Sequence, residues 1–206
     1  MKLCMFHPND QPLERGWPGR IDGDTVVQLA AQTLQSFFSG GGAAREHAEY
    51  PLDEVTLVAP VLHPPAVRLF DSVRDFAFGN PAAIRSPGQE ATRPGGADGI
   101  EALVRPTAVI GAEGRPGGYT ILGELRALGH EPPKDRDFAL FLGPWVETEP
   151  GQDLYDWDAL VARAAANTHL RSGDLVAAPA VQVAELDVGP FELAVDGLGV
   201  LAGRLA

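Results

Sequence analysis

The chain has little cysteine, little positive charge and no long apolar run, and each shortage excludes a class of protein. Its 206 residues include one cysteine, Cys4, so no intramolecular disulfide can form, and we expect this thiol to be buried and inert. The 16 Lys and Arg residues against 28 Asp and Glu residues give a net charge of −12, and the basic residues form no run. This balance argues against nucleic acid and anionic membrane surfaces as partners.

Apolar segments are also short. The opening MKLCMFHPND has too few apolar residues in a row for a secretory signal, and no stretch approaches the roughly 18 apolar residues of a membrane-spanning helix. We therefore expect a cytoplasmic protein.

Glycine and proline, by contrast, are abundant, with 24 and 18 residues, which favours turns and short strands over long helices. Residues 2–6 and 20–29 are expected to be strands, the second broken by a turn at Asp22-Gly23-Asp24. The spacing of Leu34, Phe37 and Phe38 predicts a short helix that ends at the Gly40-Gly41-Gly42 run. We place a domain boundary near residue 53, between a small α+β domain (1–53) and a larger, mostly β domain (54–206).

In the larger domain, residues 84–105 are rich in Gly, Pro and Arg and are expected to form a surface loop. Residues 108–110 and 119–122 are expected to be paired strands, and residues 191–201 a closing hairpin. A helix capped by Asp153 is also predicted, and the residues of its apolar face are Leu154, Trp157, Leu160, Val161 and Ala164.

Several segments, in the same order along the chain, resemble the fumarylacetoacetate hydrolase superfamily. They span nearly the whole of residues 1–206 and include Leu57-Val58-Ala59-Pro60-Val61, Gly79-Asn80-Pro81, Gly118-Tyr119-Thr120-Ile121-Leu122, Asp137-Phe138-Ala139, Leu142-Gly143-Pro144-Trp145-Val146, Ser172-Gly173-Asp174-Leu175 and Val195-Asp196-Gly197. The resemblance implies an α+β, mostly β fold with a rolled mixed sheet, and a homodimer. It also implies hydrolysis or decarboxylation of oxo-acids or dicarbonyl compounds with a carboxylate-bound divalent metal.

The residues at this family's metal and catalytic positions are mostly replaced here. The family's Glu-x-Glu pair corresponds to Leu103 and Arg105, its aspartate ligand to Glu124, and its lysine to Arg136. Glu101 could replace a lost glutamate only through a shift in strand register. The family's catalytic histidine segment is also missing, because only a short stretch separates Val73 from Asn80, and a second shortening falls between Gly111 and Gly118.

The resemblance therefore implies a degenerate site. No metal is expected, and Mg²⁺ or Mn²⁺ would bind only if this interpretation is wrong, with Glu124 and Glu101 as the remaining ligand candidates. The candidate catalytic residues are Arg105, Glu124 and Arg136. If Arg105 points into the former metal pocket, its charge could pair with Glu124 and close the site without a cation.

Three functional hypotheses follow. The chain could be a pseudoenzyme with a binding or structural role. It could be an active enzyme of altered, possibly metal-independent mechanism, in which arginines bind a small oxo-acid or dicarbonyl ligand. It could also be a non-catalytic partner of an intact paralogue.

The remaining polar residues have simpler interpretations. His47 and Glu49 have the residue types of an acid/base pair but precede the entry strand, and we interpret them as part of a solvated segment. The scattered histidines have no second ligand at metal spacing; they are His7, His63, His130 and His169. Asp153, Asp156 and Asp158 are explained by the dipole of the predicted helix.

Overall fold

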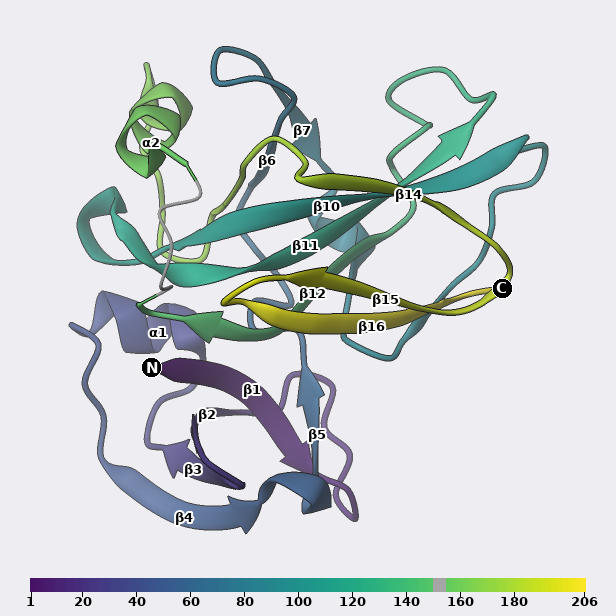
Figure 1. Ribbon diagram of the computed structural model, residues 1–206. Helices are drawn as coiled ribbons and strands as arrows, with labels where there is room; N and C mark the ends of the chain where they lie inside the picture. The colour runs from purple at the N-terminus through teal and green to yellow at the C-terminus, as the bar shows by residue number, and fades with distance from the viewer. Residues whose placement is uncertain (150–154) are drawn as a thin grey trace.

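The strands of the computed structural model, which describes residues 1–149 and 155–206, form two sheets (Figure 1). Ten of the 13 strands in the larger sheet follow the order β4-β3-β2-β1-β12-β11-β10-β13-β6-β7. The other three lie beside this path, since β5 pairs with β1, β8 with β12 and β14 with β10. The smaller sheet has the order β15-β16-β9. The predicted mostly β architecture is confirmed.

The N-terminal elements match the sequence prediction except at one strand. A tight turn at Gly23, whose φ of 57° suits glycine, joins two of the predicted strands. The missed strand is polar and mostly exposed, so it carries no apolar alternation that could reveal it. The elements are β1 (Lys2–Pro8), β2 (Trp17–Asp22), β3 (Thr25–Leu29), α1 (Leu34–Ser39), β4 (Glu46–Pro51), the 3₁₀ turn Leu52–Glu54 and β5 (Val55–Val58).

β1 belongs to both parts of the molecule. Its first residues, Lys2 and Leu3, pair with Glu147 and Val146 of β12, while Met5 to Pro8 pair with β5. The N-terminal strands and the body are therefore hydrogen-bonded into one continuous sheet.

The body is built on three long antiparallel strands, β10 (Gly99–Ile110), β11 (Pro116–Leu128) and β12 (Leu140–Glu147). The predicted pairing of residues 108–110 with 119–122 and the closing hairpin are confirmed. The predicted loop 84–105 is wrong at its end, because β10 already begins at Gly99, and it also contains the two-residue strands β8 and β9. The other elements are β6 (Val67–Phe70), β7 (Phe76–Gly79), β8 (Ile84–Arg85), β9 (Glu90–Ala91), α2 (Trp157–Ala165), β13 (Leu175–Ala177), β14 (Gln182–Leu186), β15 (Gly189–Val195) and β16 (Gly199–Leu205), with 3₁₀ turns at Pro81–Ala83 and Ala112–Gly114.

Successive residues of β10 face two different environments, as the period of a strand requires. Ile100, Ala102 and Val104 belong to the apolar cluster formed with the smaller sheet, which includes Leu193 and Leu201. Leu103 and Arg105 alternate with these residues and therefore face the other side of the larger sheet. One buried strand thus separates an apolar core from a polar site.

The clearest predicted helix is present, with a different cap. α2 begins after Asp156, whose side chain accepts a hydrogen bond from the backbone N–H of Ala159 at 3.0 Å. Leu160 and Ala164 are buried, as the predicted apolar face requires. Asp153 and Leu154 of the prediction lie outside the described residues.

Cys4 is buried, as predicted, and burial raises the pKa of its thiol to about 12. The thiolate, which is the reactive form, is therefore scarce at neutral pH. Among the described residues, no helix has the length and apolar character needed to cross a membrane.

Candidate functional site

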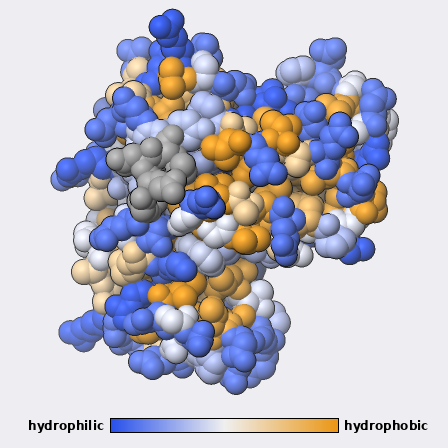
Figure 2. All heavy atoms as spheres, in the orientation of Figure 1, coloured by the Kyte–Doolittle hydropathy of each residue, from blue (hydrophilic) through white to orange (hydrophobic). Residues whose placement is uncertain are grey.

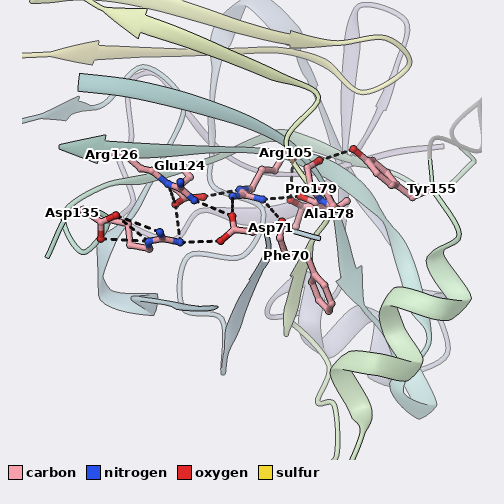
Figure 3. A network of polar contacts seen from close by, with 11 residues as sticks. Phe70, Asp71, Arg105, Glu124, Arg126, Asp135, Tyr155, Ala178 and Pro179 are labelled. Atoms are coloured by element: carbon pink, nitrogen blue, oxygen red, sulfur yellow. Dashed lines mark hydrogen bonds and ion pairs between the residues drawn. The ribbon is translucent and has the colours of Figure 1, made fainter. Parts of the chain in front are cut away.

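Strand register brings the positions singled out by the sequence onto one face of the larger sheet. Leu103 of β10 lies directly opposite Glu124 of β11, so their side chains share a face. Arg105, two residues further along β10, projects to the same face and reaches diagonally to Glu124 (Figure 3).

Arg105 is the centre of the site, and its side chain is only 1% exposed. Its Nε donates to Glu124 Oε2 at 2.6 Å, and its Nη2 donates to Asp71 Oδ1 at 2.9 Å. Its Nη1 donates to the carbonyl oxygens of Phe70 and Ala178. Every nitrogen of this guanidinium therefore has an acceptor, which is what a buried cation requires.

Glu124 is fully buried, with both oxygens engaged by arginines. Besides the bond from Arg105, Oε1 accepts from Arg126 Nε at 2.7 Å. The pairing of Arg105 with Glu124 that the sequence suggested is therefore present. A metal ion that coordinated this carboxylate would therefore lie beside two guanidinium groups that already hydrogen-bond to it.

A third arginine and two further carboxylates complete the cluster, which we call the arginine–carboxylate network. Arg136 Nη1 lies 3.6 Å from Asp71 Oδ2 and 3.7 Å from Glu124 Oε1. Its Nη2 lies 3.3 Å from Asp135 Oδ2. Arg126 Nη2 also donates to Asp71 Oδ1 at 3.0 Å. The three guanidinium charges of Arg105, Arg126 and Arg136 thus face the three carboxylates of Asp71, Glu124 and Asp135.

The network is deeply buried at one end and open at the other. Glu124 is at the buried end, whereas the Asp71 side chain is 51% exposed. Burial acts to raise the pKa of Asp71, but the hydrogen bonds and charges of Arg105 and Arg126 outweigh it and hold that pKa below its ordinary value. Asp71 is therefore an ionised carboxylate at the mouth of the site.

Tyr155 closes the other flank near the start of α2. Its hydroxyl donates to the carbonyl oxygen of Pro179 at 2.6 Å, one residue after the Ala178 carbonyl that receives Arg105. Burial raises the pKa of this phenol, and the Arg105 charge only partly opposes that rise. Tyr155 is therefore a neutral hydrogen-bond donor here (Figure 3).

The residues that the sequence resemblance aligned with metal ligands offer few oxygen atoms to a metal. Leu103 and Arg105 supply none. Glu101 lies on the same face of β10, two residues before Leu103, and is opposite Arg126. Within residues 1–149 and 155–206, no group of three or more His, Cys, Asp and Glu side chains is arranged to hold a metal ion.

The other residues weighed from the sequence lie elsewhere. His47 and Glu49 are exposed on β4. His63 lines a surface cavity of about 480 Å³ beside α1. His169 lines another of about 870 Å³, between the end of α1 and the loop after β10. Neither His47 nor Glu49 is brought into contact with the network by any described hydrogen bond.

Sequence reasoning missed Asp71 and did not recognise the role of Arg126. Asp71 directly follows β6, where an acidic residue after an apolar strand has no distinctive spacing. Arg126 shares a face with Glu124 because it lies two residues further along β11, and this i, i+2 pairing was the available signal.

Comparison with known proteins supports the fold over the full length. No family model and no curated protein sequence matches the chain. Three solved structures, however, match all of it and 99% of their own chains. They are an uncharacterised protein from Mycobacterium abscessus ATCC 19977 (TM-score 0.81, 19% identity), a 5-carboxymethyl-2-hydroxymuconate delta-isomerase from Mycobacterium smegmatis (0.78, 20%) and the maleylpyruvate hydrolase from Sphingobium sp. SYK-6 (0.77, 19%).

The chain therefore has the fold of fumarylacetoacetate hydrolase superfamily proteins, as the sequence motifs indicated. The maleylpyruvate hydrolase has also been solved with manganese(II) and pyruvate (TM-score 0.76, 19% identity).

Proposed function

We propose that this protein is a degenerate member of the fumarylacetoacetate hydrolase superfamily in which the arginine–carboxylate network takes the place of the divalent metal. It is then not a conventional metal-dependent hydrolase. The observation that carries the proposal is the 2.6 Å contact of Arg105 Nε with Glu124 Oε2, in which a permanent cation occupies the one retained carboxylate.

Electrostatics supports this proposal. A divalent ion coordinated by Glu124 would lie near the guanidinium groups of Arg105 and Arg126, which both contact this carboxylate. Two unit positive charges about 4 Å apart repel by roughly 4 kcal/mol at an effective dielectric constant of about 20. The negative charges of Glu124 and Asp71 are already paired with these two arginines, so they leave little net attraction for a further cation.

A metal and activity titration tests the proposal. Chelator-treated protein is titrated with Mg²⁺ and Mn²⁺ by isothermal calorimetry and then assayed with oxaloacetate and an acylpyruvate. We expect no binding heat and no metal-dependent turnover. The maleylpyruvate hydrolase from Sphingobium sp. SYK-6 is the matched positive control, because its structure holds manganese(II). Tight Mn²⁺ binding with turnover would overturn the proposal and point to a ligand set that includes Glu124 or Glu101.

A second candidate is an enzyme that acts on a small oxo-acid or dicarbonyl compound without a metal. It is favoured by Arg136, whose buried Nη1 has no hydrogen-bond partner among the described residues. Turnover that persists in excess chelator distinguishes this candidate from the first.

We also propose a homodimer, with pairing to an intact paralogue as the alternative. Hydrophobic residues gather on one face over β10 and β14 (Figure 2). Val181, just before β14, is 48% exposed, and Val183 within β14 is 57% exposed. β14 pairs only with β10 among the described strands, so its outer edge is open.

Light scattering coupled to size exclusion should give the mass of a dimer for the wild type. Val183→Asp should shift the chain toward monomer, because a charge is costly inside an apolar interface. Val200→Asp on β16, at a valine that is 49% exposed, is the matched control and should stay dimeric. A monomeric wild type would exclude the homodimer, and co-elution with a full-length relative would then support the paralogue.

A further inference from the structure

Asp71 faces all three arginines of the network from its solvent side. It lies at the mouth, where its Oδ1 accepts from Arg105 Nη2 at 2.9 Å and from Arg126 Nη2 at 3.0 Å. Its Oδ2 faces Arg136 Nη1 at 3.6 Å. A single half-exposed carboxylate thus bridges three guanidinium groups from the solvent side, which is the arrangement that arginines provide for a ligand carboxylate (Figure 3).

Asp71 does not satisfy this position completely. Arg136 Nη1 is buried and has no hydrogen-bond partner in the described part of the chain, although two carboxylates lie just beyond hydrogen-bond distance. Charge-assisted bonds between arginine and carboxylate are normally about 2.7–2.9 Å long. An anion free to choose its position could reach this nitrogen, whereas Asp71 is held back by its place on the chain.

The local structure allows Asp71 to leave without opening the sheet. The preceding residue, Phe70, is buried and its carbonyl is held by Arg105, so the base of the β6–β7 turn is fixed. Residues 71–75 are exposed, and the turn is closed by the Asp71 N–H, which donates to the Asp75 carbonyl at 3.1 Å. Rotation of the Asp71 side chain alone would therefore free the three guanidinium groups.

We propose that this site binds a small carboxylate anion, and that Asp71 is a tethered internal competitor that the anion displaces. The proposal rests on the metal-free site proposed above. Moving Asp71 out leaves three guanidinium charges against Glu124 and Asp135, a net charge of +1 that matches a monoanion. The wild type then binds the anion more weakly, because the three arginines are available only during the fraction of time that Asp71 is rotated away.

Acetate is the probe, and Asp71→Asn is the principal variant because it keeps the shape and removes the charge. We expect Asp71→Asn to bind acetate at least about tenfold more tightly than the wild type in calorimetry at constant ionic strength. Chloride at the same concentration should compete only slightly, since it cannot form paired hydrogen bonds. Asp71→Ala should give a gain in affinity of similar size. It replaces Asp71→Asn as the test if the asparagine amide forms new hydrogen bonds with the network.

Asp75→Asn is the matched control. It removes the same charge from the same turn, but Asp75 forms its hydrogen bonds with Ser72 and Asp71 rather than with an arginine, so acetate affinity should not change. No gain in either Asp71 variant, or an equal gain in Asp75→Asn, overturns the inference. Mn²⁺ is titrated into the same samples. If neither acetate nor Mn²⁺ binds, only this inference is contradicted. If Mn²⁺ binds to the wild type, the proposed function on which the inference rests is contradicted.

Discussion

Replacing Arg105 by methionine is expected to lower the free energy of unfolding by about 3–5 kcal/mol, because the buried Glu124 would lose one of the two arginines that hydrogen-bond to it and keep only Arg126. The carbonyl oxygens of Phe70 and Ala178 would also lose their donor. For a chain of this size each kcal/mol moves the thermal midpoint by about 2–4 °C, so the midpoint should fall by about 10 °C. Chemical and thermal denaturation followed by circular dichroism measure both quantities.

Two further variants separate a buried-charge effect from the loss of any arginine. Arg105→Met combined with Glu124→Leu should recover most of the lost stability, because replacing both members of a buried pair with apolar residues is often neutral. Arg115→Met removes an arginine that is 75% exposed and paired with Glu113 at the surface, and should change stability by less than about 0.5 kcal/mol. A double variant as unstable as Arg105→Met would contradict this account.

Introducing glutamate at both Leu103 and Arg105 is expected to create a Mn²⁺ site. Leu103 lies directly opposite Glu124, and Arg105 shares the same face, so three carboxylates would converge at one point. Carboxylate oxygens are the ligands that Mn²⁺ favours. Without metal the three negative charges repel, so the variant should be less stable than the wild type in chelator.

Mn²⁺ at about 100 times its dissociation constant should then restore roughly 2.7 kcal/mol, seen as a rise in thermal midpoint. The control places glutamine at both positions, which keeps the size of the side chains and removes the charges. It should show no response to Mn²⁺. An equal response in the two variants would mean that the metal binds elsewhere, and that Leu103 and Arg105 do not mark the former ligand positions.

The sequence predicts the fold best where burial imposes a period. The hairpin of residues 191–201 and the helix over Leu160 and Ala164 could be predicted because their apolar residues recur at strand and helix spacing, and both are confirmed. β4 was missed because its residues are almost all exposed, and pairing with β3 rather than burial holds it in the sheet. The start of β10 was missed because the residues before it are rich in glycine, proline and arginine, a composition that is typical of a loop.

The site was predictable only in part, for a similar reason. The motif order placed Arg105 and Glu124 at related positions, and strand register then brought them together. Asp71 is 34 residues from Arg105 in the sequence, and nothing in its local pattern reveals which buried cation it will meet. Contacts of this kind depend on how β6 is placed beside β13, which is a property of the whole sheet.

The double pairing of β1 restricts how this molecule can move. Its first residues are hydrogen-bonded to β12 and its last to β5, so rotating the N-terminal strands against the body as two rigid halves would break backbone hydrogen bonds on one side or the other. Hinge motion at this junction would therefore cost the hydrogen bonds of one of these two strand pairings. The proposed anion would then enter through side-chain rotation and turn motion, which occur in picoseconds to microseconds rather than the microseconds to milliseconds of domain closure.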